Sequence, residues 1–374
     1  MDAVDNNVVY IFFNLLEAGL WGEDVRISQF GPIDYAALMR LAEEQSVVGL
    51  ITAGLEHVKD VQIPKEWTLQ FIGNTLQLEQ RNKAMNAFIA DLVSKMRVTG
   101  IYTLLLKGQG IAQCYDKASW RACGDVDLFL SDDNYEKAKV FLSPFASTVE
   151  EEYKREKHLG MTIDGWALEL HGRLYSGLSS RIERELDEVL KDTFYGGSVR
   201  SWNCEGVQVF LMKEENDIFY VFTHILQHFY KEGVGLRQIC DWSRSLWFYR
   251  ERIDLRLLEG RIKRAGLMTE WKAFGAYAVV YLGMAVEAMP FYSDDKCWKR
   301  KAKRINKFVL SVGNMGHNRD ISYFGKYPYV IRKAISFGRR FADLWRHARI
   351  FPLDSLKFFP SIVVNGLRSA ARGE

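Results

Sequence analysis

Two aspartates separated by one apolar residue are the feature that most constrains this chain. Asp125 and Asp127 alternate with Val126, Leu128 and Leu130, and this period of two predicts a β-strand. Side chains two residues apart on a strand point to the same face, so the two carboxylates lie side by side. Like charges this close repel unless a cation neutralises them. We therefore expect a site for Mg²⁺ or Mn²⁺, which bind carboxylates together with substrate phosphates.

An exposed strand face that carries two acids without any ligand is the alternative. The apolar flanks argue for a central strand, where paired acids are costly without a metal. A third acid follows in the predicted strand 166–171, where Glu169 and His171 share one face. If the two strands are neighbours, Glu169 joins the aspartates in a three-carboxylate site. His171 then becomes a candidate to bind substrate or to orient the carboxylate.

A glycine-rich turn precedes the Asp-x-Asp strand. The β-prone run 101–106 ends at Lys107-Gly108-Gln109-Gly110, and residues 111–115 can begin a helix. A strand, a tight turn and a helix start can form an anion cradle of backbone N–H groups. Lys107 could reach a triphosphate from this turn, or be an ordinary surface lysine. Arg121 could contact a phosphate, or lock the loop before Asp125.

These motifs resemble the nucleotidyltransferase superfamily, which contains DNA polymerase β, poly(A) polymerases and aminoglycoside nucleotidyltransferases. That signature is an apolar residue, Gly-Gly or Gly-Ser, a spacer, Asp-apolar-Asp or Glu, and a later carboxylate. Here the places are taken by Leu106, Gly108-Gln109, Asp125-Val126-Asp127 and Glu169. Gln109 replaces a small residue, and the spacer 110–124 is longer than usual.

More narrowly, the chain is similar to a bacterial family of uncharacterised nucleotidyltransferases over roughly residues 8 to 290. The motifs that carry this likeness are Leu106-Lys107-Gly108, Arg121-x-x-Gly124-Asp125-Val126-Asp127-Leu128, Leu168-Glu169-Leu170-His171-Gly172-Arg173-Leu174 and Gly235-Leu236-Arg237-Gln238-Ile239-Cys240-Asp241-Trp242.

The resemblance implies an α+β fold, with a minimal nucleotidyltransferase core and a mixed sheet between N- and C-terminal helical regions. The implied reaction transfers NMP from an NTP to an acceptor hydroxyl by a two-metal mechanism. Asp125, Asp127 and Glu169 are the expected catalytic residues and metal ligands. The expected nucleotide-binding residues are Lys107, Gly108, Gln109, Gly110, Arg121 and His171.

The acceptor cannot be read from these motifs; a sugar, a lipid-linked glycan, a protein or an RNA end would each suit. Two other classes stay open. One is a non-catalytic module that keeps the fold and senses a nucleotide or a glycan. The other is an interaction protein attached to an anionic surface by its basic C-terminal region.

The charge is divided unevenly along the chain. From residue 296 onward there are 18 Lys and Arg against 4 Asp and Glu, a balance of +14. The whole chain carries +3, so the rest carries −11. This asymmetry predicts an anionic partner for the basic end, and the acidic body itself is one candidate.

Other features indicate an intracellular protein. The five cysteines show no paired spacing, as expected of free thiols in a reducing compartment. The first residues lack the basic start of a signal peptide. The apolar run near 273–286 is too short to span a bilayer. We therefore expect a cytoplasmic protein without a transmembrane segment.

Helical periodicity flanks the α/β segment on both sides. We expect an N-terminal helical region (1–97), the catalytic core (98–210), a helical domain (211–295) and a basic helical region (296–374). On the predicted helices, Arg237 and Asp241 are spaced to pair at i, i+4. His224 and His228 have the same spacing, which can bind a metal but is commoner as a packed pair. In the basic region, an apolar stripe is expected to pack on the body; it comprises Ile331, Ile335, Phe341, Trp345 and Ala348.

Overall fold

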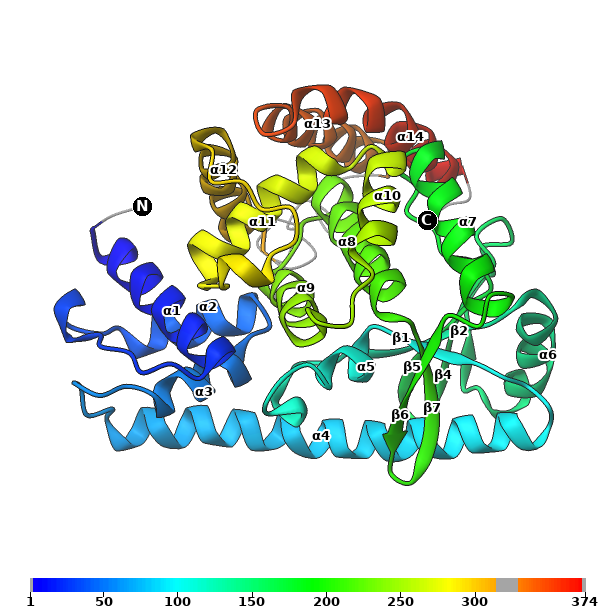
Figure 1. Cartoon of the computed structure of the whole chain (residues 1–374), viewed down its shortest axis with the longest axis horizontal. Coiled ribbons are helices and arrows are strands. Elements are labelled where there is room, and N and C mark those ends of the chain that lie inside the picture. The colour runs from blue at the N-terminus through cyan, green and yellow to red at the C-terminus, as the bar shows by residue number, and fades with distance from the viewer. Residues whose placement is uncertain (1–2, 314–328, 372–374) are drawn as a thin grey trace.

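The fold comes from a computed structural model, which describes residues 3–313 and 329–371. In Figure 1 the long helix α4 runs along one side, and a sheet and a bundle of helices lie over it. The mixed sheet between helical regions confirms the predicted α+β class. The division of the chain at residues 97, 210 and 295 stays a prediction.

The N-terminal helices pack through glycines. At Gly54 of α3, a Cβ atom would lie 1.9 Å from the carbonyl oxygen of Leu15 in α1, so only glycine allows this approach. Helix α4 has 34 residues and is therefore about 50 Å long. The elements of this region are α1 (Ala3–Trp21), η1 (Ser28–Phe30), α2 (Tyr35–Glu44), α3 (Val48–Glu56) and α4 (Lys65–Val98).

The sheet has seven strands in the order β3-β4-β5-β2-β1-β7-β6. Strand β2 is parallel to β5 and β1 is parallel to β7, while the other neighbours are antiparallel. The strands are β1 (Leu104–Leu106), β2 (Asp125–Phe129), β3 (Thr148–Val149), β4 (His158–Ile163), β5 (Trp166–His171), β6 (Val199–Cys204) and β7 (Val207–Met212). Between them lie α5 (Gly108–Ala112), η2 (Ala118–Trp120), α6 (Asp132–Leu142), η3 (Ser143–Phe145) and α7 (Ser180–Phe194).

Alternation along β2 divides its side chains between two hydrophobic cores. Val126 and Leu128 belong to the smaller core, which includes Ile89 and other residues of α4. Phe129 belongs to the larger core, together with Phe219 and its neighbours in α8. Asp127 has the same parity as Phe129, so it points to the α8 side of the sheet. The site therefore faces the C-terminal helices rather than α4.

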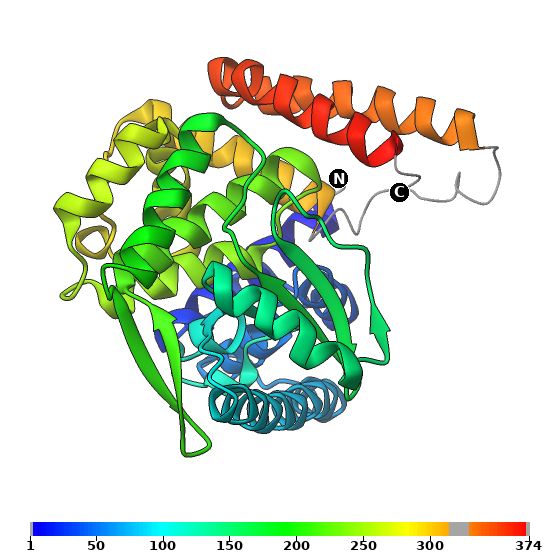
Figure 2. The ribbon, with the colours of Figure 1, turned by 90° about the vertical axis from the view of Figure 1, so that its right-hand side faces the viewer.

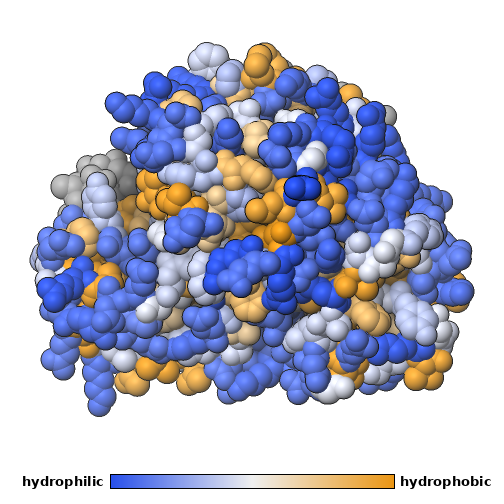
Figure 3. Space-filling model, viewed as in Figure 1, coloured by the Kyte–Doolittle hydropathy of each residue, from blue (hydrophilic) through white to orange (hydrophobic). Residues whose placement is uncertain are grey.

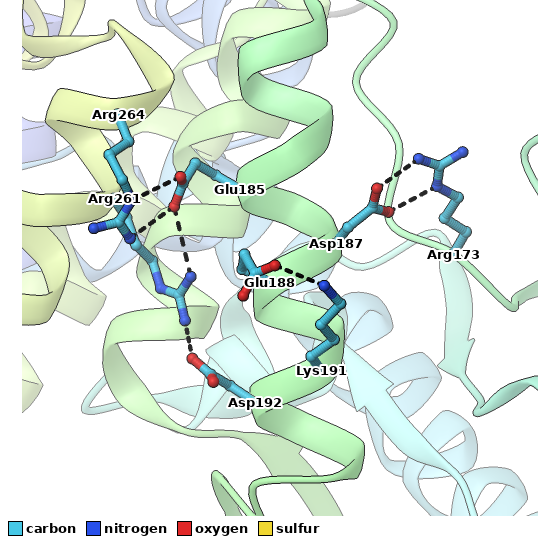
Figure 4. Close-up of polar contacts among 8 residues, drawn as sticks. All are labelled: Arg173, Glu185, Asp187, Glu188, Lys191, Asp192, Arg261 and Arg264. Carbon is cyan, nitrogen blue, oxygen red and sulfur yellow. Dashed lines mark hydrogen bonds and ion pairs between the residues drawn. The ribbon is translucent and has the colours of Figure 1, made fainter.

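The C-terminal helices are clamped to α7 by ion pairs (Figure 4). Glu185 of α7 accepts two hydrogen bonds from Arg264, at 2.8 and 2.9 Å, and contacts Arg261 at 3.8 Å. Arg261 also pairs with Asp192. The Glu185 and Arg261 side chains are only 4% and 1% exposed, so each depends on its partner. The helices here are α8 (Glu214–Lys231), α9 (Leu236–Tyr249), α10 (Leu255–Ala265), α11 (Met268–Leu282), η4 (Val286–Ala288) and α12 (Lys296–Val312).

Two final helices, α13 (Tyr329–Ala348) and α14 (Pro352–Ala371), form the antiparallel pair seen at the top of Figure 2. The His347 ring packs on Phe229 of α8, with ring centroids 4.8 Å apart. The predicted stripe is wrong at Ile331 and Trp345, which are 45% and 64% exposed, whereas Ile335 and Ala348 are half-buried. The Phe341 side chain lies outside the described residues. Instead, His347 of this helix points inward and packs against aromatic rings.

Apolar residues gather in the middle of the face shown in Figure 3, around α9 and α11. Hydrophilic residues cover most of the rim. None of the helices within residues 3–313 and 329–371 has both the length and the apolar composition to cross a membrane.

Candidate active site

Three carboxylates meet on the α8 side of the sheet. Strands β2 and β5 are parallel neighbours, and their register places Asp127 beside Glu169. One oxygen each from Asp125, Asp127 and Glu169 lies within 4.8 Å of the others. The Asp127 side chain is only 1% exposed. The charge of Asp127, and then burial, raises the pKa of Asp125. These like charges make the site a strong attractor of cations.

Lys107 supplies one compensating charge. It follows β1 directly, and the antiparallel register places Leu106 opposite Asp127. Its backbone has a φ of 48°, and Gly108 follows with a φ of 43°. This turn brings Lys107 Nζ to 3.2 Å from Asp127 Oδ1. Burial lowers the pKa of Lys107, but the nearby acids outweigh it and the net pKa is raised, so the ammonium stays charged.

Two histidines contact Asp127 and Glu169. His171 Nε2 lies 2.9 Å from Asp127 Oδ1 and 3.4 Å from Glu169 Oε2. His158 Nε2 lies 3.1 Å from the same Glu169 oxygen. Burial raises the pKa of Glu169, but the hydrogen bonds to both histidines outweigh it and leave the pKa lowered. The pKa of His171 is raised, because its bonds to the two acids outweigh burial.

His158 was missed by sequence reasoning, although a signal was present. Asp164-Gly165 is a favoured two-residue hairpin turn. Counting back equally from that turn places His158 opposite His171, which is the observed register of β4 and β5.

The rest of the glycine-rich turn faces the protein body. The Gln109 side chain is buried and donates from Nε2 to Asn82 Oδ1 of α4 at 2.8 Å. A Cβ atom on Gly110 would lie 2.7 Å from Leu211. Gln109 and Gly110 therefore pack the turn and do not line the site with side chains. The following helix α5 has only five residues, so its helix dipole is much weaker than the predicted anion cradle would need.

Arg121 holds the loop before β2 through Asp241, and its contact with a phosphate stays a prediction. Its side chain is 5% exposed, and it binds Asp241 through two hydrogen bonds, at 2.9 and 2.6 Å. Tyr115 also donates to Asp241, at 2.8 Å. The predicted Arg237–Asp241 pair is thus wrong, and Arg237 donates to the carbonyl of Ala122 instead.

Helix α8 covers the site with a histidine pair. His224 Nε2 lies 3.3 Å from Lys107 Nζ and 3.2 Å from His228 Nε2. Burial, and then Lys107 and His228, hold the pKa of His224 well below its usual value. Within the described residues, this pair belongs to no group of three or more His, Cys, Asp or Glu that could hold a metal. Tyr220, one turn earlier, is also buried, which raises its pKa to about 12.

A cavity of about 620 Å³ opens where β5 ends and α7 begins. Its charged lining residues are Arg155, Arg173, Arg184, Glu183 and Asp187, and Pro360 of α14 also borders it. Arg173 lies two residues beyond His171 and pairs with Asp187 (Figure 4). No ion pair is recorded for Arg155 or Arg184 in the part of the chain that the structure describes. The volume is in the range of small-molecule sites.

The mixed sheet flanked by helices is consistent with a nucleotidyltransferase-like α+β fold. The family model described as uncharacterised nucleotidyltransferase matches residues 31–283, and the chain belongs to that family. No curated protein and no solved structure matches the chain.

Proposed function

We propose that this protein transfers NMP from an NTP to an acceptor hydroxyl and releases pyrophosphate. The observation that carries the proposal is the convergence of Asp125, Asp127 and Glu169 within 4.8 Å of one another. Membership of the nucleotidyltransferase family supports an NTP as the donor. The roles of the three acids as catalytic residues and metal ligands are part of this proposal.

The three carboxylates fit Mg²⁺, a hard ion that prefers oxygen ligands. Lys107 places a positive charge beside Asp127, as expected where clustered carboxylates call for cations. When bound to these acids, two Mg²⁺ ions would neutralise charge on the triphosphate and activate the acceptor hydroxyl. The lowered pKa of Glu169 favours a ligand over a proton acceptor.

Lys107 and His171 have distinct proposed roles. Lys107 Nζ lies between Asp127 and His224, at 3.2 and 3.3 Å, so a small rotation can transfer it to a phosphate oxygen. Its raised pKa keeps it protonated at neutral pH. His171 contacts both Asp127 and Glu169, and would hold these two carboxylates in their relative orientation.

The acceptor is proposed to be an anionic molecule held in the neighbouring cavity. Arg155, Arg173 and Arg184 line the cavity together with Glu183 and Asp187. Because Arg173 is bound to Asp187, Arg155 and Arg184 are the arginines that would meet an anionic acceptor. Arginine forks recognise carboxylate, sulfate and phosphate groups. A glycan that carries such groups would suit both the charge and the volume.

Asp125→Asn is the sharpest test of the proposed activity. The variant should abolish Mg²⁺-dependent release of pyrophosphate from an NTP and its acceptor, while the protein stays folded because a repulsion is removed. Asp133→Asn, an exposed change in α6, serves as the control. Undiminished pyrophosphate release by Asp125→Asn would refute the proposal. Calorimetry that shows NTP binding without any turnover would favour the non-catalytic sensing module.

A further inference from the structure

We propose that His158, Glu169 and His171 form a separate site for a divalent transition-metal ion, of the series from Mn²⁺ to Zn²⁺. One ligand atom from each of these residues lies within 4.8 Å of the others. The site shares Glu169 with the carboxylate cluster and adds two imidazole nitrogens to it. The inference deepens the proposed function and rests on it for any role in catalysis, but metal binding can be tested without activity.

Backbone pairing holds the three residues together. His158 and His171 are directly opposite each other in the antiparallel pair β4–β5. Glu169 lies two residues before His171, so its side chain leaves the same face of the sheet. The two imidazole rings are 4.8 Å apart. Rigid strands of this kind position ligands more closely than loops can.

The distances suit a shared ion. Two ligands that are each about 2.1 Å from a metal, at angles of roughly 90 to 110°, are themselves about 3.0 to 3.4 Å apart. Glu169 Oε2 lies 3.1 Å from His158 Nε2 and 3.4 Å from His171 Nε2. An ion that binds here would replace the contact of His171 Nε2 with Asp127 Oδ1, which is 2.9 Å long. The alternative is that the histidines only donate hydrogen bonds to Glu169, and the same distances permit this.

An ion can reach these atoms from solvent. The side chains of His158, Glu169 and His171 are 25%, 35% and 12% exposed. Lys107 is bound to Asp127 rather than to Glu169. The contacts of Glu169 at this point are thus to the two histidines, and solvent water could complete the coordination of an ion.

The chemical type of the ligand atoms determines which metal ions the site prefers. Imidazole nitrogens suit Mn²⁺, Fe²⁺, Co²⁺ and Zn²⁺, whereas Mg²⁺ prefers oxygen ligands and keeps its waters. Two histidines with one carboxylate also form the facial arrangement that leaves positions open to other ligands. The chain should therefore bind both classes of ion, with Glu169 shared between them: Mg²⁺ with the aspartates and a transition metal with the histidines.

Co²⁺ is a suitable probe, because its visible absorption reports nitrogen ligation. Titration of the whole protein should show saturable Co²⁺ bands, and calorimetry should give separate Co²⁺ and Mg²⁺ affinities. His158→Gln should weaken Co²⁺ binding about tenfold or more and leave Mg²⁺ binding unchanged. His57→Gln serves as the matched control, since His57 contacts Asp24 at the other end of the fold.

Three results would overturn the proposal. Equal Co²⁺ affinity in His158→Gln and His57→Gln would exclude His158 as a ligand. An equal loss of Co²⁺ and Mg²⁺ binding would show that His158 only supports Glu169. Should the variant fail to fold, electron spin echo of Mn²⁺ bound to the wild-type protein decides, and absence of nitrogen coupling would refute the site. Loss of nucleotidyl transfer alone would bear on the proposed function instead.

Discussion

Glu270 makes stability depend on pH, although it lies away from the site. This residue of α11 is fully buried, and Tyr230 donates to its Oε1 at 3.2 Å. Its Oε2 has no hydrogen-bond partner in the described part of the chain. Burial, and then the charge of Asp354 in α14, raises the pKa of Glu270 from 4.5 to about 8. The folded protein therefore keeps this carboxyl protonated at neutral pH.

The sign of the pH effect follows from that raised pKa. The unfolded chain ionises Glu270 above pH 4.5, whereas the folded chain does so only near pH 8. Its contribution to stability is fully present below pH 4.5 and is lost as the pH rises to about 8. Each pH unit in this window costs about 1.4 kcal/mol, so the loss at pH 7 is roughly 3 kcal/mol.

Glu270→Gln removes this ionisation and keeps an oxygen for Tyr230. We expect its free energy of unfolding in urea to exceed that of the wild type by an amount that grows with pH. Between pH 5 and pH 7 the difference should grow by about 3 kcal/mol, and it should level off above pH 8. Glu287→Gln, on the exposed η4, should show a constant difference. Parallel profiles of Glu270→Gln and the wild type would refute the reasoning.

Three further predictions follow from the buried charges and the cavity. Asp125→Asn should raise the urea midpoint of unfolding, because Asp127 and burial raise the pKa of Asp125. This gain in stability should grow as the pH rises above 3.8. Asp127→Asn should instead lower the midpoint, because Lys107 loses its partner. Glu185→Ala should lower the free energy of unfolding by ~3 kcal/mol, since buried Arg261 is left poorly paired, whereas the exposed Glu188→Ala should cost less than ~1 kcal/mol. In calorimetry, Arg184→Gln should weaken binding of a heparin oligosaccharide severalfold without changing NTP affinity. If the variant binds the oligosaccharide as tightly as the wild type, the cavity is not the site of an anionic acceptor.

Local periodicity was enough to predict the centre of the site. The alternation around Asp125 and Asp127 indicated a strand, and the alternation around Glu169 indicated a second one. Because the period of a strand is two, each pattern also specified which side chains share a face. The convergence of the three carboxylates needed one further assumption, that the two strands are neighbours, and the register of β2 with β5 satisfies it. Their role as metal ligands stays a prediction.

Tertiary structure decided which charged groups pair. The spacing of Arg237 and Asp241 on one helix predicted a local pair, but Arg121 reaches Asp241 from a distant loop. A buried fork with two hydrogen bonds outweighs an i, i+4 contact of a few tenths of a kcal/mol.

Long-range packing likewise decided which face of the last helices points inward. It also decided which side chains contact the acids of the site. Helix α13 turns His347 inward because rings of α8 and α12 receive it, and Trp345 stays exposed. Lys107 joins Asp127 because a turn follows β1, which a local pattern could only suggest. Local sequence therefore determined strand faces, whose period is built into the backbone. Pairing between distant side chains was determined only by the packing of the whole chain.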